Sequence, residues 1–443
     1  MKAFARCPFF HLRYALCAML YALPLEASLE RIQSLIGFLA FVLIAWFFSE
    51  KRRNVNLKTV ASGLILQLLI AFILLKAPGV QVFFLWLNRA VEALEESTRA
   101  GTSFVFGYLG GAPLPFDEKS PGMSYVFGFR GLPLVLVMSA LSSLLFHWRI
   151  LPLVVRGFSW VLRRTMGLGG VEGLSTAANV FVGMVEAPLL VRPYLYKVSR
   201  SELFTIMVGG MASIAGTVMV LYASFLSESI PNAMGHLLIA SLISAPAAVC
   251  VSKLMIPETG LSSAADVPLE SSAAGAMDAI TAGTVDGAKL LINIFAMLVV
   301  LIALVHIVNL VLSLIPHLPS GEAITLQWLL GWVMAPVTWL MGIPWSETMA
   351  AGKLMGIKTV LNELLAYADL SRLPDGALSE RSRVILVYGM CGFANLGSLG
   401  IMIGGMGAMA PERRGEIVSM GLKSIVAGTI ATCMTGAAVG ILL

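Results

Sequence analysis

Long apolar runs dominate the sequence and set the class of protein that it can form. Eight of them approach or exceed the roughly 20 residues that a helix needs to cross a bilayer; they lie at about 33–48, 59–75, 133–148, 203–227, 232–256, 288–315, 383–408 and 415–443. Charged residues make up only 12% of the chain, and its mean hydropathy is +0.87, whereas a soluble domain carries about 25% charged residues. We therefore predict an all-α polytopic membrane protein with about eight transmembrane helices, surrounded by the lipid bilayer.

Basic residues gather in the short loops between these runs. Because cytoplasmic loops are enriched in Lys and Arg, a topology with both termini outside places all of these loops in the cytoplasm: Lys51 to Lys58, Arg149 to Arg164, Arg192 to Arg200, and Arg413 with Arg414. This topology requires two further segments, about 168–196 and 325–370, to enter and leave the membrane from one side. The stretches 88–112 and 150–165 mix charged and apolar residues at helical spacing, which is typical of interfacial helices.

The first 30 residues permit two interpretations. Lys2, Arg6 and Arg13 precede the short apolar run Tyr14–Leu23, as in a signal peptide. An upstream mis-start, with Met19 as the true first residue, explains the same pattern, so no function is drawn from this region.

The two re-entrant segments resemble each other in composition. Each is interrupted by Gly or Pro and a carboxylate, in V-E-A-P and in L-N-E-L-L-A-Y, and each is followed by a helix broken at glycines. A Gly-Met pair ends 25 residues after Glu186 in one half and 27 residues after Glu363 in the other. Such duplication in opposite orientations is typical of inverted-repeat secondary transporters, whose broken helices mark the substrate site. We therefore expect two re-entrant helical hairpins within an inverted repeat.

The duplication divides the chain into five parts. These are an N-terminal extension (1–32), scaffold and interfacial helices (33–165), a first transport repeat (166–256), a linker and scaffold helix (257–320), and a second transport repeat (321–443).

Glu186 and Glu363 are carboxylates at matching places in this duplication. Placing an ionisable group inside the bilayer costs free energy, so such a residue suggests a function. Glu186 or Glu363 alone could be an internal ion pair or a helix cap, but the pair favours a binding site. Asn179, Ser213 and Asn395 lie beside the glycine breaks, where unwound backbone and neutral oxygens can coordinate a cation such as sodium. Each could also bond a neighbouring helix.

Three lysines interrupt the apolar segments. We expect Lys353 and Lys358 to extend their side chains to an interface. Lys423 lies within the last apolar run and could pair with a carboxylate.

The motifs of soluble enzymes are missing from the sequence. Its five cysteines show no C-x-x-C spacing, its five histidines no paired ligand spacing, and it contains neither a P-loop nor G-x-S-x-G. We therefore expect no enzyme activity and no organic cofactor, and the surplus charge of +5 does not indicate nucleic acid.

Four motifs, in order and over nearly the whole chain from about residue 33, resemble the concentrative nucleoside transporter family. They are A-A-N-V-F-V-G-x-x-E-A-P-L-L-V-R-P-Y, G-G-M-A-S-I-A-G, K-T-V-L-N-E-L-L-A-Y and C-G-F-A-N-L-G-S-L-G-I-M-I-G-G. The resemblance implies a homotrimer in which each protomer has a scaffold and a mobile part that moves across the membrane as an elevator. It also implies a sodium ion held by side-chain oxygens of Asn179 and Ser213 and by the backbone carbonyls of Val182 and Ile214.

The resemblance implies a riboside site as well. Glu363, Asn395 and Ser398 would bind sugar hydroxyls beside Phe393, Glu186 would lie near the base or a bound water, and Val218 would form an apolar wall.

The chain departs from the family at the first hairpin tip. Many members have Gln followed by Thr or Ser where this chain has Met184 and Val185, neither of which can hydrogen-bond a base. An unsatisfied polar group costs about 1–3 kcal/mol, so uridine should bind poorly. We expect altered base selectivity, with purine ribosides or a hydrophobic aglycone accommodated by the adaptable methionine.

These observations favour sodium-coupled uptake of nucleosides or related ribosides by a multi-pass protein of the bacterial inner membrane. Two alternatives stay open: a proton-coupled carrier that uses Glu186 or Glu363, and a membrane protein that senses ribosides or forms a passive channel.

Overall fold

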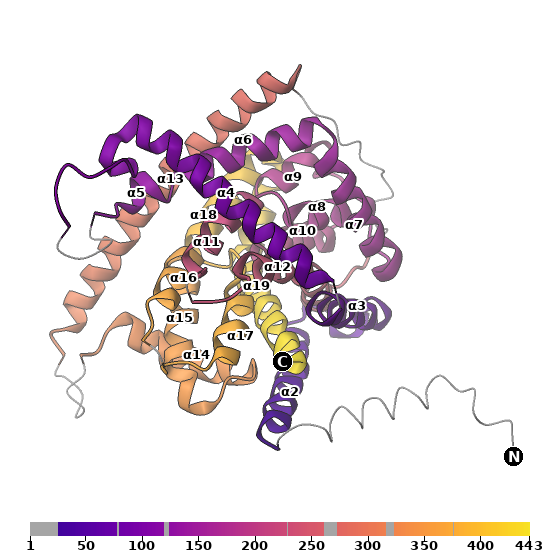
Figure 1. The fold of residues 1–443 in the computed structure, drawn as a ribbon. Helices are drawn as coiled ribbons and strands as arrows, with labels where there is room; N and C mark the ends of the chain where they lie inside the picture. The colour runs from indigo at the N-terminus through magenta and orange to yellow at the C-terminus, as the bar shows by residue number, and fades with distance from the viewer. Residues whose placement is uncertain are drawn as a thin grey trace, which may run out of the picture.

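The computed structural model describes residues 25–77, 79–118, 124–227, 229–260, 273–315, 323–374 and 376–443, and all regular structure within them is helical (Figure 1). This confirms the all-α prediction. The expectations for residues 1–24 and for the middle of the linker, 261–272, lie outside the described residues.

The first half of the chain begins with peripheral helices and continues into a group of shorter ones. The peripheral helices are α2 (Leu25–Phe47), α3 (Leu57–Lys76), α4 (Val80–Phe106), α5 (Phe127–Arg130), α6 (Leu134–His147) and α7 (Ile150–Met166). The group that follows comprises α8 (Gly170–Asn179), α9 (Glu186–Leu190), α10 (Arg200–Ala212), α11 (Gly216–Leu226) and α12 (Ala233–Met255). Of the stretches expected to form interfacial helices, 150–165 lies within α7, and 88–112 is α-helical in α4 as far as Phe106.

The second half repeats this order after the long helix α13 (Ala276–Leu312). Its helices are α14 (Leu326–Leu340), α15 (Thr348–Val360), α16 (Glu363–Ser371), α17 (Glu380–Met390), α18 (Leu396–Met409) and α19 (Arg414–Leu442). The series α8 to α12 therefore has a counterpart, helix by helix, in α15 to α19. The duplication read from the sequence is present in the element order.

Seven stretches of the described chain are long and apolar enough to cross a membrane. Six of the expected runs correspond to α2, α3, α5 with α6, α12, α13 and α19, and a seventh to α10 with α11. The eighth, 383–408, is divided between α17 and α18, with an irregular stretch from Cys391 to Asn395. Both breaks fall where glycines were expected to interrupt the helices.

Burial separates an inner group of helices from an outer one. In the most apolar stretch of the span formed by α10 and α11, 89% of the residues are buried, and the same share holds for α12. In α13 the share is 6%, although this helix is highly apolar. Figure 1 shows α12 and α19 in the middle of the molecule and α13 along one side. An exposed apolar helix of this length needs lipid or another subunit to cover it.

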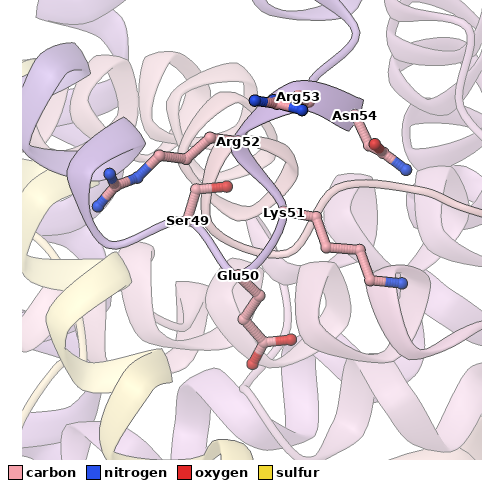
Figure 2. A pocket seen from close by; sticks show the side chains of 6 residues that line it. All are labelled: Ser49, Glu50, Lys51, Arg52, Arg53 and Asn54. Atoms are coloured by element: carbon pink, nitrogen blue, oxygen red, sulfur yellow. The ribbon is translucent and has the colours of Figure 1, made fainter.

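Charged side chains from three parts of the chain meet around Glu50. Glu50, in the loop between α2 and α3, is paired with Arg200 at 3.2 Å and with Lys423 at 2.5 Å. Lys423, which lies within α19, therefore pairs with a carboxylate, as the sequence allowed. The same loop, residues 49–54, lines a shallow open pocket that Figure 2 shows from close by. The contact between Glu50 and Arg200 brings together the loop after α2 and the start of α10.

Candidate functional site

The two broken helices meet in the interior. The backbone N–H of Phe393, in the break between α17 and α18, donates to the carbonyl of Ser213, in the break between α10 and α11, at 3.2 Å. Only glycine fits beside this contact, because a β-carbon on Gly392 would lie 2.8 Å from the carbonyl oxygen of Met211. The irregular backbone is thus buried in protein, the setting in which a membrane protein tolerates it.

A buried carboxylate lies next to the second break. Glu363 is the first residue of α16 and is 4% exposed. The Tyr222 hydroxyl, from α11, donates to its Oε1 at 2.7 Å, and Asn395 Nδ2 donates to its Oε2 at 3.0 Å. Asn395 also caps α18, since its Oδ1 accepts from the backbone N–H of Ser398 at 2.7 Å. That cap fixes the orientation of the amide, so its N–H₂ faces the carboxylate.

The sequence-predicted residues of the sugar site are therefore brought together. Glu363, Asn395 and Ser398 form one chain of hydrogen bonds, and Phe393 lies two residues before Asn395 in the same break. Val218 is buried on α11, one helical turn before Tyr222.

Tyr222 was missed by the sequence reasoning. The available signal was its i+4 spacing from Val218, which places both on the same face of a helix. Its ring also packs against Tyr367 of α16, with 5.3 Å between the ring centroids.

The turn between α8 and α9, which we expect to be the first hairpin tip, has a different arrangement. Glu186 begins α9 and is exposed, and its carboxylate lies against Gly183 of the turn. No hydrogen bond joins Glu186 to Glu363, although both are described.

Met184 and Val185 dock onto glycines of neighbouring helices. A β-carbon on Gly210 of α10 would lie 2.9 Å from the Cβ of Met184, and one on Gly405 of α18 would lie 2.7 Å from a methyl group of Val185. Met184 therefore packs this turn against the first broken helix, and Val185 packs it against the second.

The residues expected to bind sodium surround the end of α8. Asn179 is its last residue and is 1% exposed, and among the described residues neither side-chain polar atom of Asn179 has a hydrogen-bond partner. Ser213 Oγ lies 3.2 Å from the Asn179 carbonyl and 2.9 Å from that of Gly209. Val182 follows Asn179 by three residues, and Ile214 adjoins Ser213 and is fully buried.

This donor set fits a monovalent cation. Its members are neutral oxygens, and the carbonyl ends of α8 and α10 add partial negative charge. In the described part of the chain, no group of three or more His, Cys, Asp or Glu residues could hold a metal. The buried, unpaired Asn179 side chain is the observation that a bound sodium ion would satisfy.

Lys358 does not reach an interface, so that expectation was wrong. It is fully buried in the last turn of α15, because α15 packs against both α14 and α17. Lys353, one turn earlier, is partly exposed. A second buried lysine, Lys253 of α12, forms an ion pair with Glu172 of α8 at 2.8 Å and so joins the start of α8 to the end of α12.

Comparison with known proteins identifies the family. Three family models match: the Na+ dependent nucleoside transporter N-terminus over residues 36–109, Nucleoside recognition over 129–229, and the Na+ dependent nucleoside transporter C-terminus over 236–440. The chain is 37% identical over 413 residues to the uncharacterized transporter YutK of Bacillus subtilis, covering 92% of this chain and 98% of that protein. It is 33% identical over 415 residues to the nucleoside permease NupC of Helicobacter pylori, covering 93% and 97%.

A solved structure agrees with these matches. The inward-facing, substrate-bound state of CNTnw superimposes with a TM-score of 0.83 at 32% identity, covering 93% of this chain and 98% of that one. The protein therefore belongs to the concentrative nucleoside transporter family, as the four motifs predicted. It is a multi-pass membrane transporter and not an enzyme.

Proposed function

We propose, from its membership of the concentrative nucleoside transporter family, that the protein imports nucleosides or related ribosides together with sodium across the bacterial inner membrane. In this proposal it works as a homotrimer whose inner helices move as an elevator against the outer ones. The name of the family models supports sodium. The exposed, apolar α13 supports a scaffold that faces lipid or another subunit.

The sugar is bound by the carboxylate cluster. Glu363 has two oxygens with about four lone-pair sites, of which Tyr222 and Asn395 use two. The remaining sites can accept ribose hydroxyls, and hydrogen bonds to a charged acceptor are the stronger kind. Ser398 contributes a hydroxyl, while Phe393 and Val218 contribute apolar surface.

The base is read without the usual polar groups. Met184 and Val185 dock on Gly210 and Gly405 and offer no hydrogen bond to a pyrimidine edge. Glu186 then remains the polar side chain at the tip. We propose that base selectivity shifts away from uridine and toward purine ribosides or a hydrophobic aglycone.

One observation supports coupling: Ser213 is hydrogen-bonded to both groups of residues that we propose as the sodium and riboside sites. Its hydroxyl lies between the Asn179 and Gly209 carbonyls, and its own carbonyl accepts the N–H of Phe393. A bound sodium ion would supply positive charge to these oxygens. With its hydroxyl so engaged, Ser213 would hold the break that carries Phe393, Asn395 and Ser398 in its binding geometry. Substrate would then bind well only when the cation site is satisfied.

Uptake into proteoliposomes tests the proposal. Radiolabelled uridine, cytidine, adenosine, guanosine and inosine would be offered with an inward sodium gradient, with a proton gradient, and with neither. We expect sodium-driven accumulation that favours purine ribosides. Accumulation driven by protons alone would support the proton-coupled alternative, and binding without flux would support a sensor.

The double variant Met184→Gln/Val185→Thr tests the base pocket. Restoring polar groups should improve relative uridine uptake by about tenfold or more, since each 1.4 kcal/mol is a factor of ten. Wild-type protein that takes up uridine as well as any purine riboside would show that these two residues do not set selectivity.

A further inference from the structure

The helices α8 and α10 approach each other closely at a glycine, and Figure 1 shows them side by side. A β-carbon on Gly209 of α10 would lie 3.2 Å from Asn179 Nδ2, 3.6 Å from Thr176 Oγ1 and 3.8 Å from the Thr176 α-carbon. Because Thr176 precedes Asn179 by one helical turn, both side chains lie on the same face of α8. Two polar side chains of one helix therefore face a single place on its neighbour.

Both of these side chains are buried without a hydrogen-bond partner. Thr176 and Asn179 are each 1% exposed. Within the described part of the chain, neither Thr176 Oγ1 nor either polar atom of the Asn179 side chain has a partner. Burying a hydroxyl or an amide without a hydrogen bond costs free energy. A single group bound between the two side chains would satisfy both of them.

The Thr176 hydroxyl does not make the bond that a threonine within a helix commonly makes, which is to the carbonyl four residues earlier. Thr205, in the neighbouring helix α10, shows the common arrangement. Its hydroxyl donates to the Ser201 carbonyl at 3.0 Å and lies 3.0 Å from Ser252 Oγ. Since Thr176 Oγ1 has no such contact among the described residues, both of its lone pairs are available to a ligand.

The surroundings of these two side chains favour a cation. Ser213 Oγ lies 2.9 Å from the Gly209 carbonyl and 3.2 Å from the Asn179 carbonyl, so further oxygens are close by. The carbonyl end of α8 adds partial negative charge. The Asn179 amide can rotate by 180° and present its oxygen without changing the shape of the side chain. Neutral oxygens beside helix ends are the ligands that sodium takes in transporters of this kind.

We propose that the Thr176 hydroxyl is a further ligand of the sodium ion, together with Asn179 and Ser213. The inference rests on the proposed sodium coupling, and it extends the cation site by one turn into α8. Asn179 and Ser213 lie where helices end, whereas Thr176 lies one turn inside α8 and is held in position before the ion arrives. The bound ion would then hold α8 against α10 at Gly209, next to the break that contains Ser213.

Variants of Thr176 separate the hydroxyl from the shape of the side chain. Thr176→Val removes the hydroxyl and keeps the shape, whereas Thr176→Ser keeps the hydroxyl. Thr205→Val is the matched control, because it makes the same change at a buried hydroxyl that already has partners. Ser175→Ala removes the adjacent buried hydroxyl of α8, which is not among the atoms nearest to Gly209. The full chain in lipid nanodiscs would be melted over a range of sodium concentrations, with choline keeping the ionic strength constant.

Thr176→Val should raise the sodium concentration at half-maximal stabilisation at least about tenfold, the equivalent of 1.4 kcal/mol, and Thr176→Ser should stay within about threefold of wild type. In choline alone Thr176→Val should melt at or above wild type, because an apolar group replaces a hydroxyl that has no partner. At sodium concentrations that saturate the wild type, this order should reverse. Thr205→Val should melt below wild type at every sodium concentration, and both it and Ser175→Ala should keep the wild-type midpoint.

A wild-type sodium midpoint for Thr176→Val would overturn the assignment and leave a water molecule as the group between the two side chains. An equal rise for Thr176→Ser or Ser175→Ala would also overturn it, since the effect would not depend on the hydroxyl that faces Gly209. A Thr176→Val deficit of the same size at every sodium concentration would show a packing role only. Wild-type protein whose melting ignores sodium would instead refute the sodium coupling itself, whatever the Thr176 variants do.

Discussion

Replacing Glu363 with glutamine should weaken riboside binding without unfolding the protein. The new side chain has the same shape and can keep both contacts of the carboxylate. Asn395 must donate, because the Ser398 cap fixes its amide, so the glutamine carbonyl faces Asn395. The glutamine amide then faces Tyr222, whose hydroxyl can reverse its role and accept.

The loss falls on the substrate. Hydrogen bonds to a charged group contribute about 1.5–3 kcal/mol and neutral ones about 0.5–1.5, a difference of about 1–1.5 kcal/mol for each bond. Two ribose hydroxyls would therefore lose about 2–3 kcal/mol. At 1.4 kcal/mol per decade, this is about 30- to 150-fold weaker binding.

Equilibrium binding to purified protein in saturating sodium measures this change directly. Adenosine and its 2′,3′-dideoxy analogue would be compared, with Glu380→Gln as a control, since Glu380 is an exposed carboxylate at the start of α17. The dideoxy analogue should bind the wild type weakly and be almost insensitive to Glu363→Gln. Equal losses for both ligands, or adenosine binding within threefold of wild type, would show that Glu363 does not read the sugar.

Three further predictions concern the cation site, the helix breaks and the ion pairs of Glu50. Asn179→Ala should raise the sodium concentration at half-maximal stabilisation at least about tenfold, the equivalent of 1.4 kcal/mol, while leaving riboside binding in saturating sodium close to wild type; an unchanged sodium titration would exclude Asn179 as a ligand. Gly392→Ala should destabilise the protein severely, because its methyl group would lie 2.8 Å from the Met211 carbonyl, and backbone cannot yield as a side chain can; wild-type melting would show that the two breaks are not locked together. Burial tends to raise the pKa of Glu50, but the hydrogen bonds from its basic partners outweigh this effect and hold that pKa below its ordinary value of 4.5. The resulting stability is present above about pH 4.5 and lost as the pH falls further, so Glu50→Gln should flatten the acid side of a plot of melting temperature against pH. Because these partners are partly exposed, the effect should be within about 1 kcal/mol, and an unchanged acid limb would show that the pairs contribute nothing.

Composition and periodicity were sufficient to predict the architecture, because the bilayer restricts the choice. A chain with this little charge must satisfy its backbone within helices, and the eight apolar runs correspond to helices in the structure. The exact number of spans was harder to obtain. A window of apolar residues does not show that 383–408 is two short helices, since the break depends on Gly392 meeting the Met211 carbonyl far away in sequence.

The site residues could be predicted where a single polar or ionisable side chain interrupts an apolar run, because burying such a group costs free energy. Glu363 and Asn395 were found in this way, and they are hydrogen-bonded to each other. Tyr222 was missed because a tyrosine in a membrane helix is ordinary. Its i+4 spacing from Val218 was the signal in the sequence, and its contact with Glu363 shows its place in the site. Sequence reasoning gave Glu186 and Glu363 equal weight, but the structure separates them, since Glu186 is exposed at the start of α9 while Glu363 is buried.

The interpretation of Lys358 failed because the sequence does not show which face of a helix is covered by other helices. A lysine in an apolar run is usually explained by its long stem, which carries the charge to an interface. That explanation treats each lysine separately, and it gives Lys353 and Lys358 the same outcome. The packing distinguishes them, because Lys358 lies in the last turn of α15 and is fully buried, while Lys353 in the same helix is partly exposed. A long stem carries a charge to an interface only where that face of the helix is open, and α14 and α17 pack against α15.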